Sequence, residues 1–248
     1  MMWSPDVLAL VFSTFFLAGF IKGVVGFGLP VVILALLVPT LGLKTAIALV
    51  IVPAVVTNTW QAFVGGHFRE IVGRIWPMLL LGCVFIWIGV GFLAGADARL
   101  AAAVLGVLLA SYAVYSLTQA QLKPPPGWEV WLTPVVGVLS GFAYGYTGSL
   151  MIPGVIYLQA LGFNKNMLVQ SLGITFLVMT SVLGLSLSGH NLMPAETALL
   201  SAASLVPTAI GMVVGQRYRH RVSEELFRKL FFWALLVAGI YMTARAVL

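Results

Sequence analysis

Charged residues are scarce in this chain, because Asp, Glu, Lys and Arg make up only 8% of its 248 residues. An ordinary soluble domain carries about 25%. Apolar residues make up 61% of the chain, so a soluble fold would leave large apolar surfaces facing water, which soluble monomers avoid. The same composition excludes a disordered chain, a collagen and a nucleic-acid-binding domain. It predicts an all-α polytopic membrane protein.

Acidic residues are absent from the middle of the apolar runs. The seven lie in loops or at the ends of runs, at Asp6, Glu70, Asp97, Glu129, Glu196, Glu224 and Glu225. A cation site or a carboxylate proton relay inside the membrane is therefore disfavoured. The three histidines also fall in loops, without the spacing of metal ligands. A Walker loop is missing, and the single cysteine, Cys83, cannot form an internal disulfide. We expect no metal, no cofactor and no catalytic residue.

Long apolar runs dominate what is present. The first covers 7–43 and is interrupted only by Lys22; at ~1.5 Å per residue it is too long for one crossing. Glycines and a proline over 22–30 predict a break between two helices, 7–21 and 30–41. The later runs are 45–65, 75–95, 99–118, 130–162, 168–188, 195–215 and 227–247, with a second break near 144–153. We expect about eight to ten membrane segments.

The two breaks are related by an internal repeat. Gly19, Gly23 and Gly26 recur as glycines 141, 145 and 148 at a constant offset of 122 residues, and a proline follows each cluster, Pro30 and Pro153. This indicates a duplication. The predicted units are a first repeat over 1–122, a Pro-rich linker over 123–129 and a second repeat over 130–248.

The distribution of Lys and Arg predicts the topology. If each broken run is a hairpin that enters the membrane and returns, one side holds ten Lys and Arg and the other holds three, Lys44, Arg99 and Arg245. The ten are Lys22, Arg69, Arg74, Lys123, Lys165, Arg217, Arg219, Arg221, Arg228 and Lys229. If each broken run crosses once, the split is eight to four and Lys22 is stranded inside. The hairpin arrangement is more asymmetric; it makes the repeats inverted and places the linker and the 217–229 loop in the cytoplasm.

Inverted repeats with interrupted helices are typical of secondary transporters. Non-helical backbone survives at membrane depth only against protein or a wet cavity, and a helix that starts there presents free amides and a positive dipole end. We therefore hypothesise that the two breaks meet and bind a small anion. The alternative is that the glycines only let helices pack closely.

Lys22 is the candidate counter-charge for the anion, and the alternative is a lysine that snorkels to the headgroups. Its repeat counterpart is Tyr144, and that of Asn58 is Thr180. Neutral donors suit an anion that must be bound and released. The predicted substrate-binding residues are Lys22, Gly23, Gly26, Gly28, Asn58, Gln61, Tyr144, Gly145, Thr147, Gly148, Ser149, Gln170 and Ser171.

Both repeated blocks resemble those of the TauE/SafE family, the sulfite exporter family. The blocks are GFIKGVVGFGLPVVILALLVPTLGLKTAIAL and GVLSGFAYGYTGSLMIPGVIYLQALGFNKNMLVQSLG. The resemblance covers essentially the whole chain. It implies a bacterial inner-membrane carrier, often an exporter, for sulfite, sulfonates or related anions. Here Phe27, Thr147 and Ser149 interrupt the consecutive glycines that are common in the family.

Two other functions are weighed against the carrier. An intramembrane enzyme would use Ser149 as nucleophile with His190 or His220 as base, although both histidines are predicted at membrane boundaries and no orienting carboxylate is identified for them. A structural or accessory membrane subunit would explain the few charged groups. The expected partners are the anionic substrate and membrane lipid, a homodimer is left open, and no nucleic acid is expected.

Overall fold

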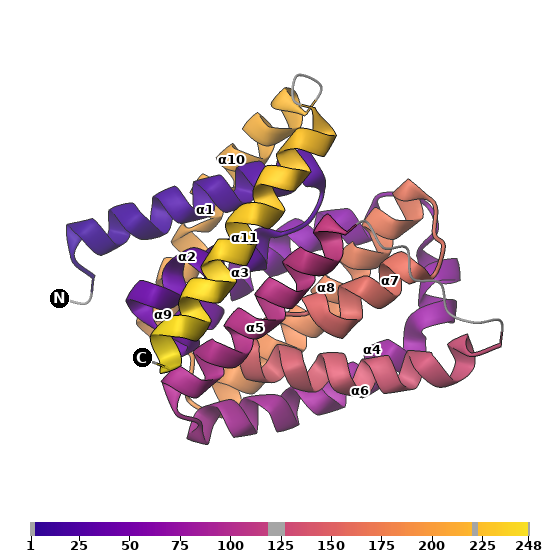
Figure 1. The fold of residues 1–248 in the computed structure, drawn as a ribbon, viewed down its shortest axis with the longest axis horizontal. Coiled ribbons are helices and arrows are strands. Elements are labelled where there is room, and N and C mark those ends of the chain that lie inside the picture. The colour runs from indigo at the N-terminus through magenta and orange to yellow at the C-terminus, as the bar shows by residue number, and fades with distance from the viewer. Residues whose placement is uncertain (1–2, 119–126, 220–222, 248) are drawn as a thin grey trace.

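The computed structural model describes residues 3–118, 127–219 and 223–247, and these ranges contain helices and no strand (Figure 1). The elements in chain order are α1 (Pro5–Val25), α2 (Leu29–Leu41), α3 (Leu43–Phe63), α4 (Phe68–Gly95), α5 (Ala98–Leu117), α6 (Glu129–Thr147), η1 (Met151–Val155), α7 (Ile156–Ala160), α8 (Lys165–Gly189), α9 (Ala195–Ala203), α10 (Leu205–Tyr218) and α11 (Glu224–Val247). Residues 123–126 of the predicted linker lie outside the described ranges.

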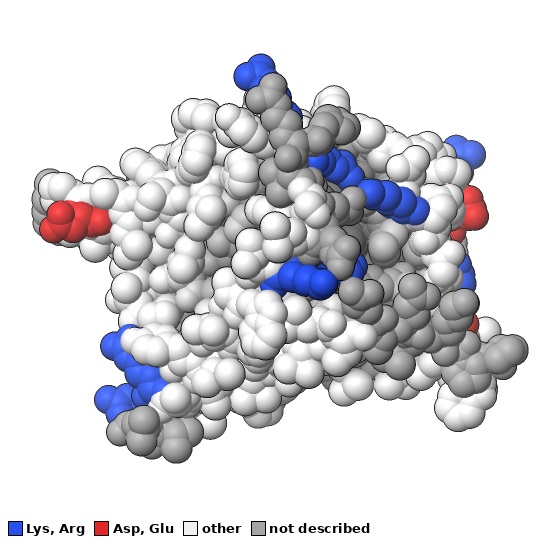
Figure 2. Space-filling view, turned by 45° about the horizontal axis from the view of Figure 1, so that its top comes forward, with Lys and Arg blue, Asp and Glu red and all other residues white. Residues whose placement is uncertain are grey.

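Seven helical segments are long and apolar enough to cross a membrane. The first, α1, has 21 residues and is therefore ~31 Å long, which matches a ~30 Å hydrocarbon core. Large apolar side chains face outward, such as Trp131 at 76% and Leu199 at 71% exposure. Figure 2 shows the charged side chains in separate groups with a wide uncharged surface between them. The prediction of an all-α polytopic membrane protein is confirmed.

Both predicted breaks are present but shorter than expected. Helix α1 continues through Lys22 to Val25, because Gly26 N–H still donates to Lys22 C=O at 2.8 Å. The chain then leaves the helix at Gly26 and Gly28, with φ of 93° and 101°, a left-handed conformation that only glycine adopts freely. In the second half α6 ends at Thr147. Lys22 therefore lies in the last turn of a helix and not in an unwound tip.

Helices of the two halves pack in a reciprocal pattern. The first helix of the first half, α1, lies along α10, and the first helix of the second half, α6, lies along α4 (Figure 1). The middle helices α3 and α8 pair with each other, as do α5 and α11. Gly173 lies against Ala62 and Gly184 against Ile51, so α3 and α8 are antiparallel. Such a reciprocal pattern is the one that two halves related by a two-fold axis would give, and the inverted repeat itself stays a prediction.

Glycines line the closest helix crossings. A Cβ on Gly23 of α1 would lie 2.4 Å from the Met212 carbonyl of α10. A Cβ on Gly141 of α6 would lie 2.4 Å from the Gly82 carbonyl of α4. Gly19 lies four residues before Gly23 in α1, and Gly145 lies four residues after Gly141 in α6. Both make similar backbone contacts with the neighbouring helix. Close packing therefore accounts for the glycines of the repeat that lie inside helices, whereas Gly26 and the corresponding Gly148 form the breaks.

We expect Gly141→Leu to lower the free energy of unfolding by about 1–3 kcal/mol, because the added side chain must push α6 away from α4. Gly73→Leu is the matched control, since Gly73 lies in α4 with no neighbouring atom within 4 Å of an added Cβ. The measurement is denaturant unfolding of purified protein in detergent. Equal stability of the two variants would show that the α4–α6 contact does not depend on a bare glycine.

Candidate functional site

Lys22 is a buried cation at the end of α1, with 6% of its surface exposed. Its ammonium donates to Asn58 Oδ1 at 2.5 Å and to Thr57 Oγ1 at 3.0 Å, both on α3. The Thr57 hydroxyl in turn donates to the Pro53 carbonyl of its own helix at 2.7 Å, so its lone pair is free to accept from the lysine. Helix α3 therefore offers the ammonium two neutral oxygens.

No carboxylate pairs with Lys22 among the described residues. Burial of an unpaired charge is costly, and a buried cation is normally paired with an anion. Two neutral acceptors satisfy two of its three N–H groups and leave its positive charge uncompensated. The arrangement is therefore suited to a mobile negative partner.

Two cavities meet at Lys22. The smaller, of about 10 Å³, is formed by the break itself and is lined by Lys22, Gly26, Phe27, Gly28, Leu29, Pro30, Asn58, Gln61 and Phe176. The larger, of about 460 Å³, is lined by Lys22, Gly23, Gly26, Thr57, Trp60, Gln61, Val64, Val169, Met212, Gln216 and Arg219. Its size falls in the range of small-molecule sites, about 300–1,000 Å³. Lys22 and Gly26 line both cavities, so the lysine stands where the larger cavity reaches the unwound backbone.

Several polar residues of the second half are buried in equivalent contacts. Tyr144 OH and Thr180 Oγ1 are 2.7 Å apart, and these residues correspond to Lys22 and Asn58 at the repeat offset of 122. Phe176 joins the two pairs, because its ring packs edge-on against that of Tyr144 and also lines the small cavity. The two halves thus hold hydrogen-bonded pairs at equivalent positions, and only the pair of the first half, Lys22 with Asn58, carries a charge.

The break glycines also make equivalent contacts. A Cβ on Gly26 would lie 3.7 Å from Val169 Cγ2 of α8, and a Cβ on Gly148 would meet Ile47 of α3. Val169 and Ile47 are separated by the same offset of 122 residues. Each break therefore rests on the third helix of the opposite half.

The side-chain amides of two predicted site residues, Gln61 of α3 and Gln170 of α8, form hydrogen bonds between these two helices. Gln61 Nε2 donates to the Val169 carbonyl at 2.7 Å and also lines both cavities. Gln170 is fully buried; its Nε2 donates to the Ala62 carbonyl at 2.9 Å and its Oε1 accepts from the His67 N–H at 3.0 Å. Ser171 bonds within its own helix, to the Leu168 carbonyl. Gln170 and Ser171 have no place in the cavities around Lys22.

The second break is closed by its own contacts. Gly145 packs against the Ile86 carbonyl of α4. Thr147 Oγ1 donates to the Ala143 carbonyl and accepts from the Ser149 N–H. The structure thus brings together Lys22, Gly23, Gly26, Gly28, Asn58 and Gln61. It leaves Tyr144, Gly145, Thr147, Gly148, Ser149, Gln170 and Ser171 outside both cavities.

The predicted set leaves out several residues that line the cavities, among them Thr57, Phe176, Gln216 and Arg219. Phe176 is one apolar residue in an apolar run, so nothing in its surroundings singled it out. Arg219 belongs to the basic 217–229 loop, and the charge of that loop predicts the membrane topology without indicating a cavity. Because α10 packs along α1, Gln216 and Arg219 at its C-terminal end face the same cavity as Lys22.

Among the described residues, the nucleophile and base of the enzyme alternative are not paired with each other. Ser149 Oγ is buried and has no hydrogen-bond partner among the described residues. His190 Nδ1 instead contacts the Ser186 carbonyl at 2.8 Å, and its ring packs near Trp87. His220 lies outside the described residues.

We expect Asn58→Leu to lower the free energy of unfolding by about 1–3 kcal/mol, because it removes a hydrogen-bond acceptor from a buried ammonium. Adding Lys22→Met should recover most of this loss, since the double variant leaves neither group unpaired. Thr59→Val is the control, because Thr59 lies exposed on the same helix and bonds only to Val55 C=O. Additive losses in denaturant unfolding of the double variant would contradict the pairing.

Comparison with known proteins places the chain in a transporter family. The sequence model of the family described as Sulfite exporter TauE/SafE matches residues 11–242, which include both breaks and all predicted site residues. No curated protein and no solved structure matches the chain. The predicted resemblance is confirmed, and the protein is an integral membrane protein of a transporter family. The chain belongs to the sulfite exporter TauE/SafE family.

Proposed function

We propose that this protein is a secondary carrier in a bacterial inner membrane that exports sulfite, a sulfonate or a related small oxyanion. The observation that carries the proposal is the buried ammonium of Lys22, which has only neutral partners and stands at the wall of a 460 Å³ cavity. Family membership supports an anion as the substrate.

The donors around Lys22 suit a sulfur oxyanion. The ammonium has three N–H donors, and the Asn58 amide nitrogen adds neutral ones, whereas the Thr57 hydroxyl already donates to the Pro53 carbonyl. The start of α2 adds backbone amides, because its N-cap is Gly28 and no side chain caps it. Free amides at a helix N-terminus bind anions together with the positive end of the helix dipole. An oxyanion with three or more acceptor oxygens could engage all of these groups at once.

The same contacts explain how the anion could leave. When the substrate departs, Lys22 returns to Asn58 and Thr57, so its N–H groups keep their partners in the empty carrier. One positive charge together with neutral hydrogen-bond donors also binds an anion less tightly than two cations would. The site therefore favours exchange over permanent retention.

Access to Lys22 comes through the larger cavity, past Gln216 and Arg219. Under the charge-based topology that end of the molecule faces the cytoplasm. Alternating access would then close this cavity and open the break over Gly26 and Gly28 toward the other side. The predicted inverted repeat supports this mechanism, because the two halves can exchange equivalent conformations.

We expect Lys22→Gln to reduce sulfite transport by at least about tenfold, because it removes the positive charge at the binding site. Tyr144→Phe should cause a smaller loss, since it removes one neutral hydroxyl from the related position. The measurement is anion flux in proteoliposomes of known protein content and orientation. Arg69→Gln is the control for general charge loss, because Arg69 is exposed and lines neither cavity.

The substrate class is tested by thermal shifts of purified protein with sulfite, methanesulfonate, sulfoacetate and simple carboxylates. A bound substrate raises the apparent melting temperature by mass action, and Lys22→Gln should abolish the rise. Full transport by a correctly inserted Lys22→Gln variant would overturn the assignment of the site. A shift with carboxylates and none with sulfur anions would overturn the substrate class.

A further inference from the structure

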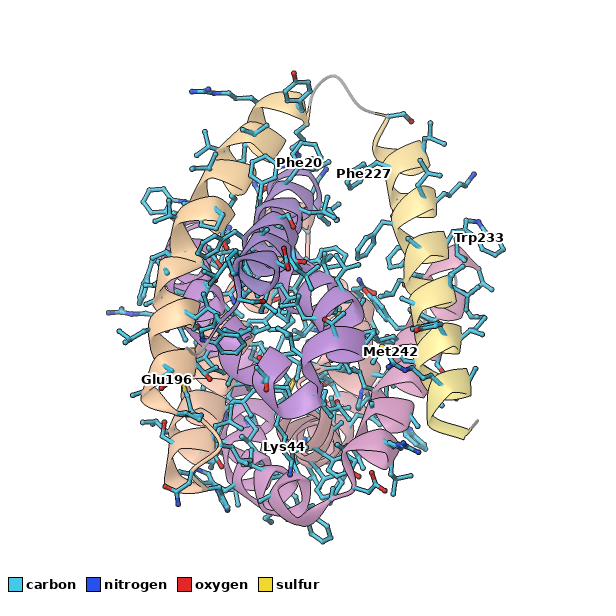
Figure 3. All side chains as sticks on the ribbon, turned by 90° about the vertical axis from the view of Figure 1, so that its left-hand side faces the viewer. Phe20, Lys44, Glu196, Phe227, Trp233 and Met242 are labelled. Carbon is cyan, nitrogen blue, oxygen red and sulfur yellow. The ribbon has the colours of Figure 1, made fainter. Side chains whose placement is uncertain are left out.

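A third cavity, of about 370 Å³, lies at the opposite end of the molecule from Arg219. Arg219 precedes α11, and Arg245 lies in its last turn. Since α11 has 24 residues, these ends are ~36 Å apart along the helix. Figure 3 shows Phe227 and Met242 toward opposite ends of α11, and Met242 lines this third cavity. The two larger cavities therefore lie toward opposite ends of the molecule.

Two arginines line the third cavity, Arg99 of α5 and Arg245 of α11, and no Asp or Glu among the described residues lines it. Arg245 Nη1 donates to the Pro39 carbonyl near the end of α2 at 2.6 Å. The guanidinium of Arg99 has no hydrogen-bond partner among the described residues, while its backbone N–H donates to Asp97. Arginine presents a planar fork of donors that matches oxyanions, so an unpaired guanidinium beside a second one favours such a ligand.

The third cation of this end, Lys44, does not line the cavity. It follows the lining residue Leu43, and its ammonium donates to the Ala94 carbonyl at 3.0 Å. The hairpin topology assigns three cations to this side of the membrane, Lys44, Arg99 and Arg245, and two of them line the cavity. Capping of helix ends accounts for Lys44 and Arg245, which bind carbonyls at the ends of α4 and α2. It does not account for Arg99.

We propose that the cavity between Arg99 and Arg245 binds an oxyanion and is the vestibule through which the substrate passes at the end of the molecule opposite Arg219. The vestibule role rests on the proposed function. The binding chemistry rests only on the two guanidinium groups, the absence of a lining carboxylate and the volume of the cavity. The oxyanion is either the free substrate or the phosphate of a lipid headgroup.

Arginine modification tests the site directly. The full-length protein in a neutral detergent is treated with phenylglyoxal, and peptide mass spectrometry gives the modification rates of Arg99, Arg245 and the exposed control Arg69. We expect methanesulfonate to slow modification of Arg99 and Arg245 at least about threefold relative to chloride of equal ionic strength, which controls for screening. Arg69 should be unaffected, and Lys22→Gln should show the same protection.

A lipid arm distinguishes the two sources of the oxyanion. The rates are measured in nanodiscs of phosphatidylcholine and of phosphatidylglycerol without added anion. Protection by methanesulfonate supports a vestibule for free anions. Protection by phosphatidylglycerol alone keeps the oxyanion site but overturns its role as a vestibule. Protection by neither ligand, or equal protection of Arg69, overturns the site.

A transport arm tests the vestibule in oriented proteoliposomes. Arg99→Gln is the cleaner variant, because Arg245 also holds the end of α2. We expect Arg99→Gln to raise KM about tenfold for anion entering at its own face and to leave KM at the opposite face unchanged. Arg99→Lys should restore part of the affinity. If wild-type protein transports no anion but methanesulfonate still protects Arg99, the proposed function fails and the binding site stands.

Discussion

The burial of one ammonium group without a carboxylate is the constraint on which the site depends. Lys22 is held by Asn58 and Thr57 from α3, and these contacts are possible only because α1 remains helical as far as Val25. A further turn of helix beyond Val25 would fill the break with side chains and remove the free amides of α2. The position of the charge and the position of the break are therefore set together.

Helix packing supplies the rest of the arrangement. Bare glycine backbones bring α1 against α10 and α6 against α4, so the first helix of each half is embedded in the opposite half. This exchange places Gln216 and Arg219 beside Lys22 in one cavity. The polar pair of Tyr144 and Thr180 occupies the equivalent place in the second half, where a neutral contact replaces the charged one. The two halves therefore contribute unequal polar contacts to the interior.

The sequence predicted the membrane class, the apolar segments and the positions of both breaks, because length, hydropathy and glycine content act locally. Lys22 and Asn58 could be selected because polar groups are rare in apolar runs. The packing role of Gly23 and Gly145 could not be predicted from the sequence. A glycine at a helix crossing and a glycine in an unwound segment give the same sequence pattern. The positions of Phe176 and Arg219 at the cavities depend on which helices pack together. No local feature of the sequence contains that information.

The glycine crossings also limit how the protein can change shape. Where Gly141 touches the Gly82 backbone and Gly23 touches the Met212 backbone, rotation of one helix about its own axis would drive a neighbouring side chain into its partner. Each pair, α1 with α10 and α4 with α6, is therefore expected to move as one rigid body. The glycine joint at Gly26 and Gly28, where the backbone is unwound, is then the natural pivot between α1 and α2.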